Sequence, residues 1–99
     1  MSTKMRKPEV LKLAENLDIT EATPLIGELL KHRGADIKID ASSVKKMGGQ
    51  CLQALLCASA TWTLDGTHIE IITPSDDFLQ CVEAYGLHLS HFSSQEPAL

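Results

Sequence analysis

The feature that most constrains this fold is one long apolar segment with helical spacing, residues 50–64. Leu52 and Leu56 widen an apolar face made by four side chains that recur every three or four positions. These four are Cys51, Leu55, Ala58 and Trp62. The run from Cys51 to Leu64 has 14 residues with polar interruptions, and a bilayer span needs roughly 18 to 20. We therefore predict a buried central helix that is not inserted in a membrane.

Covering such a helix takes most of a short chain. The chain has 99 residues, 43% of them hydrophobic, which suits a single core and excludes two independently folded domains. We predict one domain over residues 10–92, with a basic arm at residues 1–9 and a flexible tail at residues 93–99.

Strand patterns occur on both sides of the central segment. Residues 35–40 alternate apolar and polar positions, and residues 68–73 carry three β-branched isoleucines; both patterns are typical of strands. Residues 10–17 favour two short strands around a turn at residues 14–16.

Two further helices are predicted between and after these strands. The first runs from Thr20 to His32, with Thr20 as its cap, and the second runs from Pro74 to Gly86. Their apolar faces would be Leu25, Ile26, Leu29 and Leu30 in the first, and Phe78, Leu79, Val82 and Tyr85 in the second. The order of elements predicts an α/β fold, a small mixed sheet with three to four helices packed on it.

Charge and cysteine content exclude several classes of function. Nine Lys and Arg against 13 Asp and Glu give a formal charge of −4, so there is no basic surplus for nucleic acid or an anionic membrane. An odd number of cysteines and a start without a charged-then-apolar leader argue against a secreted disulfide scaffold. We expect a cytoplasmic protein.

Residues that could support catalysis or bind a metal are scattered. Cys51 and Cys57 are six residues apart on one helix, without metal-ligand spacing, and are predicted to be buried apolar side chains. The Asp76-Asp77 pair is explained by the dipole of a helix start. The four histidines are predicted to be surface or capping residues, namely His32, His68, His88 and His91. We predict no catalytic residue, no metal site and no cofactor.

The stretch IKIDASSVKKMGGQCLQAL, residues 37–55, resembles the core signature of STAS domains, the fold of anti-sigma factor antagonists. Similar segments extend the resemblance over residues 10–92, and it is closest to small STAS proteins that accompany chemotaxis genes in alphaproteobacteria. One such protein partners the chemotaxis histidine kinase and aids signal termination. The resemblance thus implies a STAS-like single domain and a non-enzymatic regulator that binds this kinase.

The chain departs from the family pattern at the start of the central helix. The pattern there has Asp, then the Ser or Thr that a partner kinase phosphorylates, then Gly, whereas this chain reads Gly48-Gly49-Gln50-Cys51. The nearest hydroxyls, Ser42 and Ser43, are interpreted as turn formers. A phosphorylation switch at this helix start is not expected, because no hydroxyl stands there.

The same resemblance implies a protein-binding face in the loop and helix start. Its predicted residues are Val44, Lys45, Lys46, Met47, Gly48, Gly49, Gln50 and Cys51, with Asp18, Thr20 and Glu21 as secondary candidates. Met47 suits an exposed, adaptable contact and equally suits the core. The lysines would attract an acidic partner surface. Two alternative functions stay open: a STAS subunit of a lipid-transport ATPase, and an anti-sigma-antagonist or nucleotide-binding regulator.

Overall fold

Parallel strand pairs organise the chain, in the computed structural model that describes residues 9–93. In chain order the elements are β1 (Glu9–Lys12), β2 (Asn16–Leu17), α1 (Ile19–Lys31), β3 (Ile37–Asp40), β4 (Lys46–Met47), α2 (Gly49–Asp65), β5 (Ile69–Ile72), α3 (Asp76–Ala84) and the 3-10 helix η1 (Leu89–Phe92). One sheet has the order β1-β3-β5, and β2 pairs with β4 in a second sheet. The α/β class is confirmed, with the described strands forming two parallel sheets rather than one mixed sheet.

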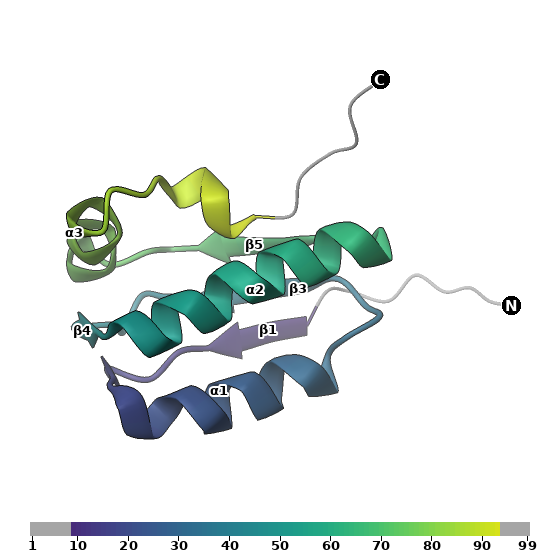
Figure 1. Ribbon diagram of the computed structural model, residues 1–99, viewed down its shortest axis with the longest axis horizontal. Helices are drawn as coiled ribbons and strands as arrows, with labels where there is room; N and C mark the ends of the chain where they lie inside the picture. The colour runs from purple at the N-terminus through teal and green to yellow at the C-terminus, as the bar shows by residue number, and fades with distance from the viewer. Residues whose placement is uncertain (1–8, 94–99) are drawn as a thin grey trace, which may run out of the picture.

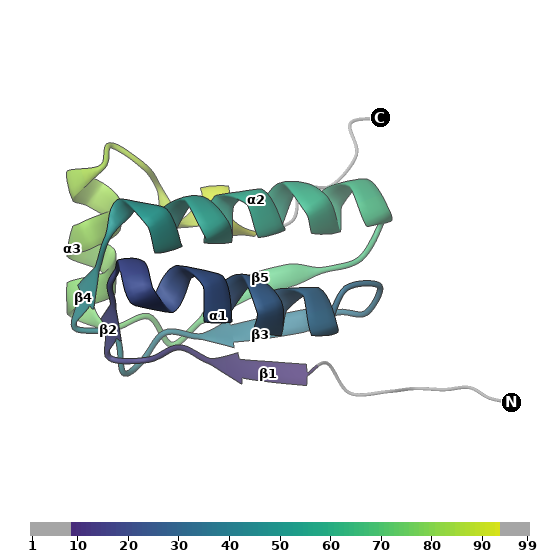
Figure 2. The same ribbon diagram turned by 60° about the horizontal axis from the view of Figure 1, so that its bottom comes forward.

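Helices α1 and α2 cover one face of the three-stranded sheet, as both views show (Figures 1 and 2). The strands point toward the end of the molecule where β4 and α3 lie, at the left of Figure 1. Helices α1 and α2 begin at this same end (Figure 2). The carboxyl ends of the strands and two helix starts are therefore gathered in one place.

The other face of the sheet carries polar side chains. Lys38 and Glu70 lie there on paired strands, with Nζ and Oε1 3.9 Å apart.

The predicted apolar face of α2 is confirmed as the centre of the core. Cys51, Leu55, Ala58 and Trp62 are all buried. The Trp62 Nε1 donates to the Ala35 carbonyl oxygen at 2.8 Å, which satisfies its buried N–H. The helix ends at Gly66, whose φ of +74° suits glycine. Cys57, predicted to be buried, is exposed, because it lies on the side of α2 away from Cys51.

Helix α1 begins one residue earlier than expected, and its cap is Asp18, not Thr20. The Asp18 carboxylate accepts a hydrogen bond from the Thr20 backbone N–H at 2.9 Å. Leu25 and Leu29 are buried, whereas the predicted apolar partners Ile26 and Leu30 are 45% and 58% exposed. A helix that covers a sheet from one side buries a single stripe, so the rest of this apolar set faces solvent.

Helix α3 has the predicted features at its start and a different face at its end. The Ser75 side chain caps it by accepting from the Phe78 N–H at 3.0 Å, and Asp76 and Asp77 occupy the first turn, as expected from the helix dipole. Phe78 is buried, but Tyr85, predicted on the apolar face, is 50% exposed. Tyr85 is the C-cap residue, beyond the last full turn.

The residues after α3 form η1, which packs against α3 and covers part of the core. The ring of Phe92 is buried and packs edge-on against Phe78, with ring centroids 6.1 Å apart. The side chains of His88 and His91 accept from backbone N–H groups at the start of η1. Both histidines are exposed and cap η1, which agrees with the prediction of surface or capping residues at these two positions.

Strand β4 was not predicted, because residues 41–46 have a polar pattern and two residues are too few to show alternation. The predicted arm and tail lie outside the described residues, with two exceptions. Glu9 begins β1, and the Ser93 carbonyl accepts from the Ser59 hydroxyl at 2.8 Å. The described domain therefore includes both boundary residues.

Candidate protein-binding surface

The eight residues predicted to bind a partner run from the loop after β3, through β4, into the first turn of α2. Three of them are buried: Val44, Met47 and Cys51 are 1%, 6% and 0% exposed. Of the two interpretations that the sequence left open for Met47, the structure supports the core and excludes the exposed contact. Its strand pairs with β2, Leu17 opposite Met47, and alternation along a strand directs Met47 inward while Lys46 faces out.

The exposed part of this stretch consists of Lys45, Lys46 and Gln50, with Gly48 and Gly49 half-buried between them. The Glu15 carbonyl fixes the loop by accepting from the N–H groups of Lys45 and Lys46 at 2.7 and 3.1 Å. The Lys45 ammonium lies 3.9 Å from the Glu15 carboxylate, a distance at the limit of an ion pair. These hydrogen bonds fix the backbone of Lys45 and Lys46, and both side chains are exposed to solvent.

The start of α2 has no polar side chain to satisfy its first N–H groups. Its N-cap is Gly48, with φ −87° and ψ 169° and no side-chain hydrogen bond, and its first turn contains no acidic residue. The first N–H groups of a helix have no partner within the helix and carry a partial positive charge. With the two lysines beside it, this helix start favours a negatively charged group.

The start of α1 has the opposite character. Its cap, Asp18, is a carboxylate and Glu21 stands in the first turn. Hydrogen bonds from the Thr20 hydroxyl and backbone N–H hold the pKa of Asp18 below its ordinary value. This carboxylate is therefore ionised and already occupied with its own helix.

The two helix starts are joined, so the primary and secondary candidates form one surface. The Gly48 N–H donates to the Leu17 carbonyl at 2.9 Å, and the Cys51 thiol lies 3.4 Å from the Asp18 carbonyl as a weak donor. Burial raises the pKa of Cys51, and the nearby carboxylates of Glu21 and Asp18 raise it further. The thiol is therefore protonated and serves as a structural link.

Two residues of this surface were not among the predicted site residues, Tyr85 and Ser75. A Cβ placed on Gly49 would lie 3.6 Å from the Tyr85 hydroxyl oxygen, so the tyrosine lies beside the first residue of α2. The Ser75 hydroxyl donates to the Val44 carbonyl at 2.6 Å and ties α3 to the same loop. Sequence alone could not place them there, because both contacts depend on how α3 packs.

Ser42 and Ser43 precede the surface, in the turn that follows β3. The Asp40 carboxylate accepts from the Ser42 N–H and from the Thr73 hydroxyl, each at 2.9 Å. Hydrogen bonds from Ser42 and then Thr73 lower the pKa of Asp40. Ser42 therefore belongs to an Asp-anchored turn, which confirms its predicted role as a turn former.

Comparison with known proteins agrees with this architecture. The sequence model of the family described as "Mlab, STAS domain" matches residues 2–89 of the 99-residue chain. The chain belongs to the STAS family. STAS domains are in general modules that bind and regulate other proteins, and this chain has their α/β architecture. Searches of curated proteins and of solved structures found no match.

Two other structural findings bear on function. Within residues 9–93, no helix is both long and apolar enough to cross a membrane. In the same part of the chain, no three His, Cys, Asp or Glu side chains come together where they could hold a metal ion.

Proposed function

We propose that this STAS domain is a non-enzymatic cytoplasmic regulator that docks on a partner protein through the joined starts of α2 and α1. The observation that carries the proposal is the bare start of α2, which has no capping side chain and no acidic residue in its first turn. Lys45 and Lys46 stand exposed beside it. An acidic side chain of the partner would satisfy its N–H groups and pair with a lysine.

The partner proposed first is a chemotaxis histidine kinase. The proposal follows from the resemblance of residues 10–92 to small STAS proteins that accompany chemotaxis genes. Binding would aid signal termination, the dephosphorylation of the response regulator. The domain's contribution would be to hold the kinase in one arrangement, since a bound protein shifts an equilibrium only through its differential affinity for two states.

Docking of this kind would not be switched by phosphate at the helix start. Gly48, Gly49, Gln50 and Cys51 occupy the positions where the family pattern includes a phosphorylated hydroxyl. Intact-mass analysis after incubation with ATP and cell extract should show no phosphate between Val44 and Leu55. Stoichiometric phosphate on Ser42 or Ser43 would restore the switch hypothesis.

A second candidate partner is a lipid-transport ATPase. The observation in its favour is the description of the matching family, which names Mlab. The same docking surface would serve, because the uncapped start of α2 could accept an acidic group from either partner. Affinity capture from native lysate with mass spectrometry separates the two: recovery of the histidine kinase supports the first candidate, and a membrane ATPase supports the second.

The surface itself is tested by Gln50→Glu, which places a carboxylate in the first turn of α2 without changing side-chain size. Repulsion of an acidic partner group should lower affinity about tenfold, a loss of about 1.4 kcal/mol. The matched control is Ala60→Glu, which adds the same charge to an exposed position of α2, about 15 Å further along the helix.

Calorimetric titration of both variants with the histidine kinase, beside thermal melts, provides the measurement. Weaker binding by Gln50→Glu alone supports the surface. Equal affinities for the two variants would exclude the α2 start from the interface.

A further inference from the structure

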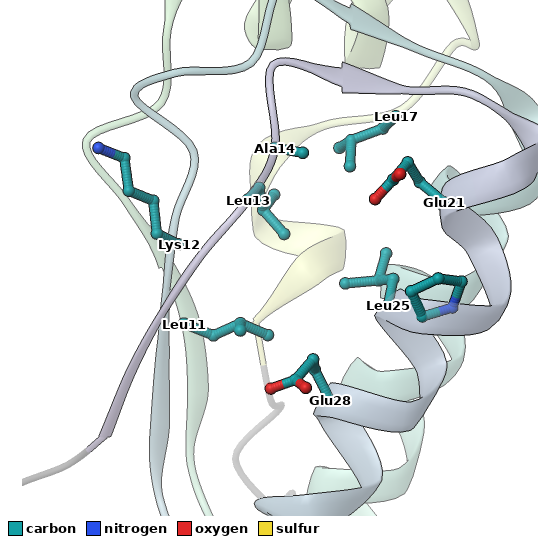
Figure 3. A pocket seen from close by; sticks show the side chains of 9 residues that line it. Leu11, Lys12, Leu13, Ala14, Leu17, Glu21, Leu25 and Glu28 are labelled. Carbon is teal, nitrogen blue, oxygen red and sulfur yellow. The ribbon is translucent and has the colours of Figure 1, made fainter.

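A pocket of about 120 Å³ lies between α1 and the segment that runs from β1 to β2. Figure 3 shows its leucine side chains converging from both sides. They are Leu11, Leu13, Leu17 and Leu25. At about 30 Å³ for each water molecule, the pocket has room for roughly four waters, a volume that matches the unbranched stem of one long side chain. Its interior is apolar.

The charged groups at the rim of this pocket are carboxylates. Glu21 and Glu28 project from α1 toward the leucines, whereas the Lys12 ammonium points away from them (Figure 3). The charge of Lys12 instead acts on Asp40. Glu21 and Glu28 are seven residues apart on α1, so they lie on one face two turns apart. The pocket therefore presents a negative rim over an apolar floor.

The two carboxylates differ in their partners. Glu28 pairs with Lys31, Oε2 to Nζ 3.0 Å, which offsets the unfavourable position of a carboxylate in the last turn of a helix. Glu21 is half-buried and has no ion pair among residues 9–93. Its charge reaches Cys51, where it helps to raise the thiol pKa. Glu21 is thus the free negative charge at the pocket.

We propose that this pocket receives a Lys or Arg side chain of a partner protein, its methylene stem against the leucines and its cation at Glu21. Charge complementarity selects this occupant: an acidic side chain would meet two carboxylates, and a purely apolar one would leave Glu21 unpaired and poorly solvated. Long basic side chains combine the two properties that the pocket needs. The inference rests on the proposed function, because Glu21 also belongs to the docking surface there.

The kinase is not needed to test the pocket. The probe is n-pentylammonium chloride, with 1-pentanol as the uncharged probe of the same length, followed by NMR of the methyl groups of Leu13, Leu17 and Leu25. The ammonium should bind saturably at millimolar concentration and at least tenfold more tightly than the alcohol. Its affinity should fall as salt is added, because the cation contacts a partly exposed carboxylate.

Glu21→Gln should weaken binding of the ammonium at least fivefold and leave binding of the alcohol unchanged. The matched control, Glu83→Gln, removes a carboxylate from the exposed surface of α3 and should change neither. Equal affinities for ammonium and alcohol, or no saturable shift, would overturn the proposal. If the ammonium binds but the kinase does not bind the chain, the proposed kinase function fails and the pocket chemistry stands.

The test must also separate a partner's side chain from the chain's own basic residues as occupants of the pocket. A variant with Lys4, Arg6 and Lys7 all changed to Gln should bind the ammonium as the unmodified chain does. Tighter binding by this variant would show that residues 1–8 compete for the pocket, and would overturn its assignment to a partner.

Discussion

The starts of α1 and α2 lie side by side, joined by the Gly48 to Leu17 hydrogen bond, but they are built in opposite ways. Helix α1 is capped by a carboxylate and has a further acid in its first turn, whereas α2 starts on glycine with neither. Helix α3 resembles α1, with Ser75 as cap and two acids following. Among the helices of residues 9–93, α2 is thus the one without a side-chain cap, and its start is the part of the docking surface proposed to receive an acidic group.

The difference indicates that α2 is stabilised by burial and α1 partly by its cap. Seven residues of α2 are buried, against two of α1. The two buried leucines of α2, Leu52 and Leu55, together contribute roughly 3 to 6 kcal/mol, which exceeds the roughly 0.5 to 2 kcal/mol typical of a cap. A helix held in this way can leave its first N–H groups open to a partner.

The largest expected effect is on the free energy of unfolding, and it tests whether the buried Met47 side chain anchors the start of α2. Met47→Asp places a carboxylate at a site that is 6% exposed, and we expect it to cost at least about 4 kcal/mol, most of the stability of a small domain. Met47→Leu should cost less than about 1.5 kcal/mol. Urea unfolding followed by tryptophan fluorescence measures both. A folded Met47→Asp domain of normal stability would place Met47 outside the core.

The next effect concerns the cap of α1. Asp18→Ala removes the carboxylate that accepts from the Thr20 N–H, and should lower the free energy of unfolding by about 1 kcal/mol. Asp18→Asn retains a capping oxygen and should recover most of this loss. The same urea titration applies. If Asp18→Ala leaves the free energy of unfolding unchanged, the cap of α1 does not stabilise the fold, and the contrast between the two helix starts does not affect stability.

A smaller effect of opposite sign is expected at α2. Gly48→Asp supplies the missing cap at a position whose φ is −87° and whose added Cβ would lie 3.6 Å from the nearest atom, the Leu17 carbonyl oxygen. The cap and the helix dipole together should raise stability by about 0.5 kcal/mol. A clear loss of stability in thermal melts would show that the bare start is required by packing and does not reflect an open binding site.

The smallest expected effect is a change in stability at acidic pH. Because the pKa of Asp18 is lower in the folded chain than its ordinary value, its charge stabilises the fold above about pH 4 and ceases to do so as pH falls through the folded pKa. The stability advantage of the unmodified chain over Asp18→Asn should therefore shrink between pH 6 and pH 3. Thermal melts over this range test it; parallel curves for the two proteins would contradict it.

Sequence reasoning succeeded where patterns are long. The 3.6-residue repeat of α2 identified Cys51, Leu55 and Trp62 as core, and the isoleucines of β3 and β5 marked their strands. It failed where a few residues decide the outcome. The two-residue β4 leaves no periodic pattern, so the inward direction of Met47 was not visible, and the cap of α1 was assigned two residues too late.

The candidate site was only partly accessible to the same reasoning. The resemblance located residues 44–51 and the neighbouring Asp18, and the structure joins them. The position of Tyr85 beside Gly49 and the leucine pocket beside Glu21 arise from contacts between elements distant in sequence. Local patterns do not encode such contacts, because they depend on how packed helices meet.

Whether the open start of α2 is a docking site is tested most directly by the affinity of Gly48→Asp for the chemotaxis histidine kinase, measured by calorimetric titration beside a thermal melt. If the open start of α2 receives an acidic group of the kinase, the new carboxylate should occupy the free N–H groups and repel that group. Gly48→Asp should therefore bind the kinase at least tenfold more weakly, in a domain that melts at the same or a higher temperature. Unchanged affinity in a domain stabilised by the new cap would contradict it.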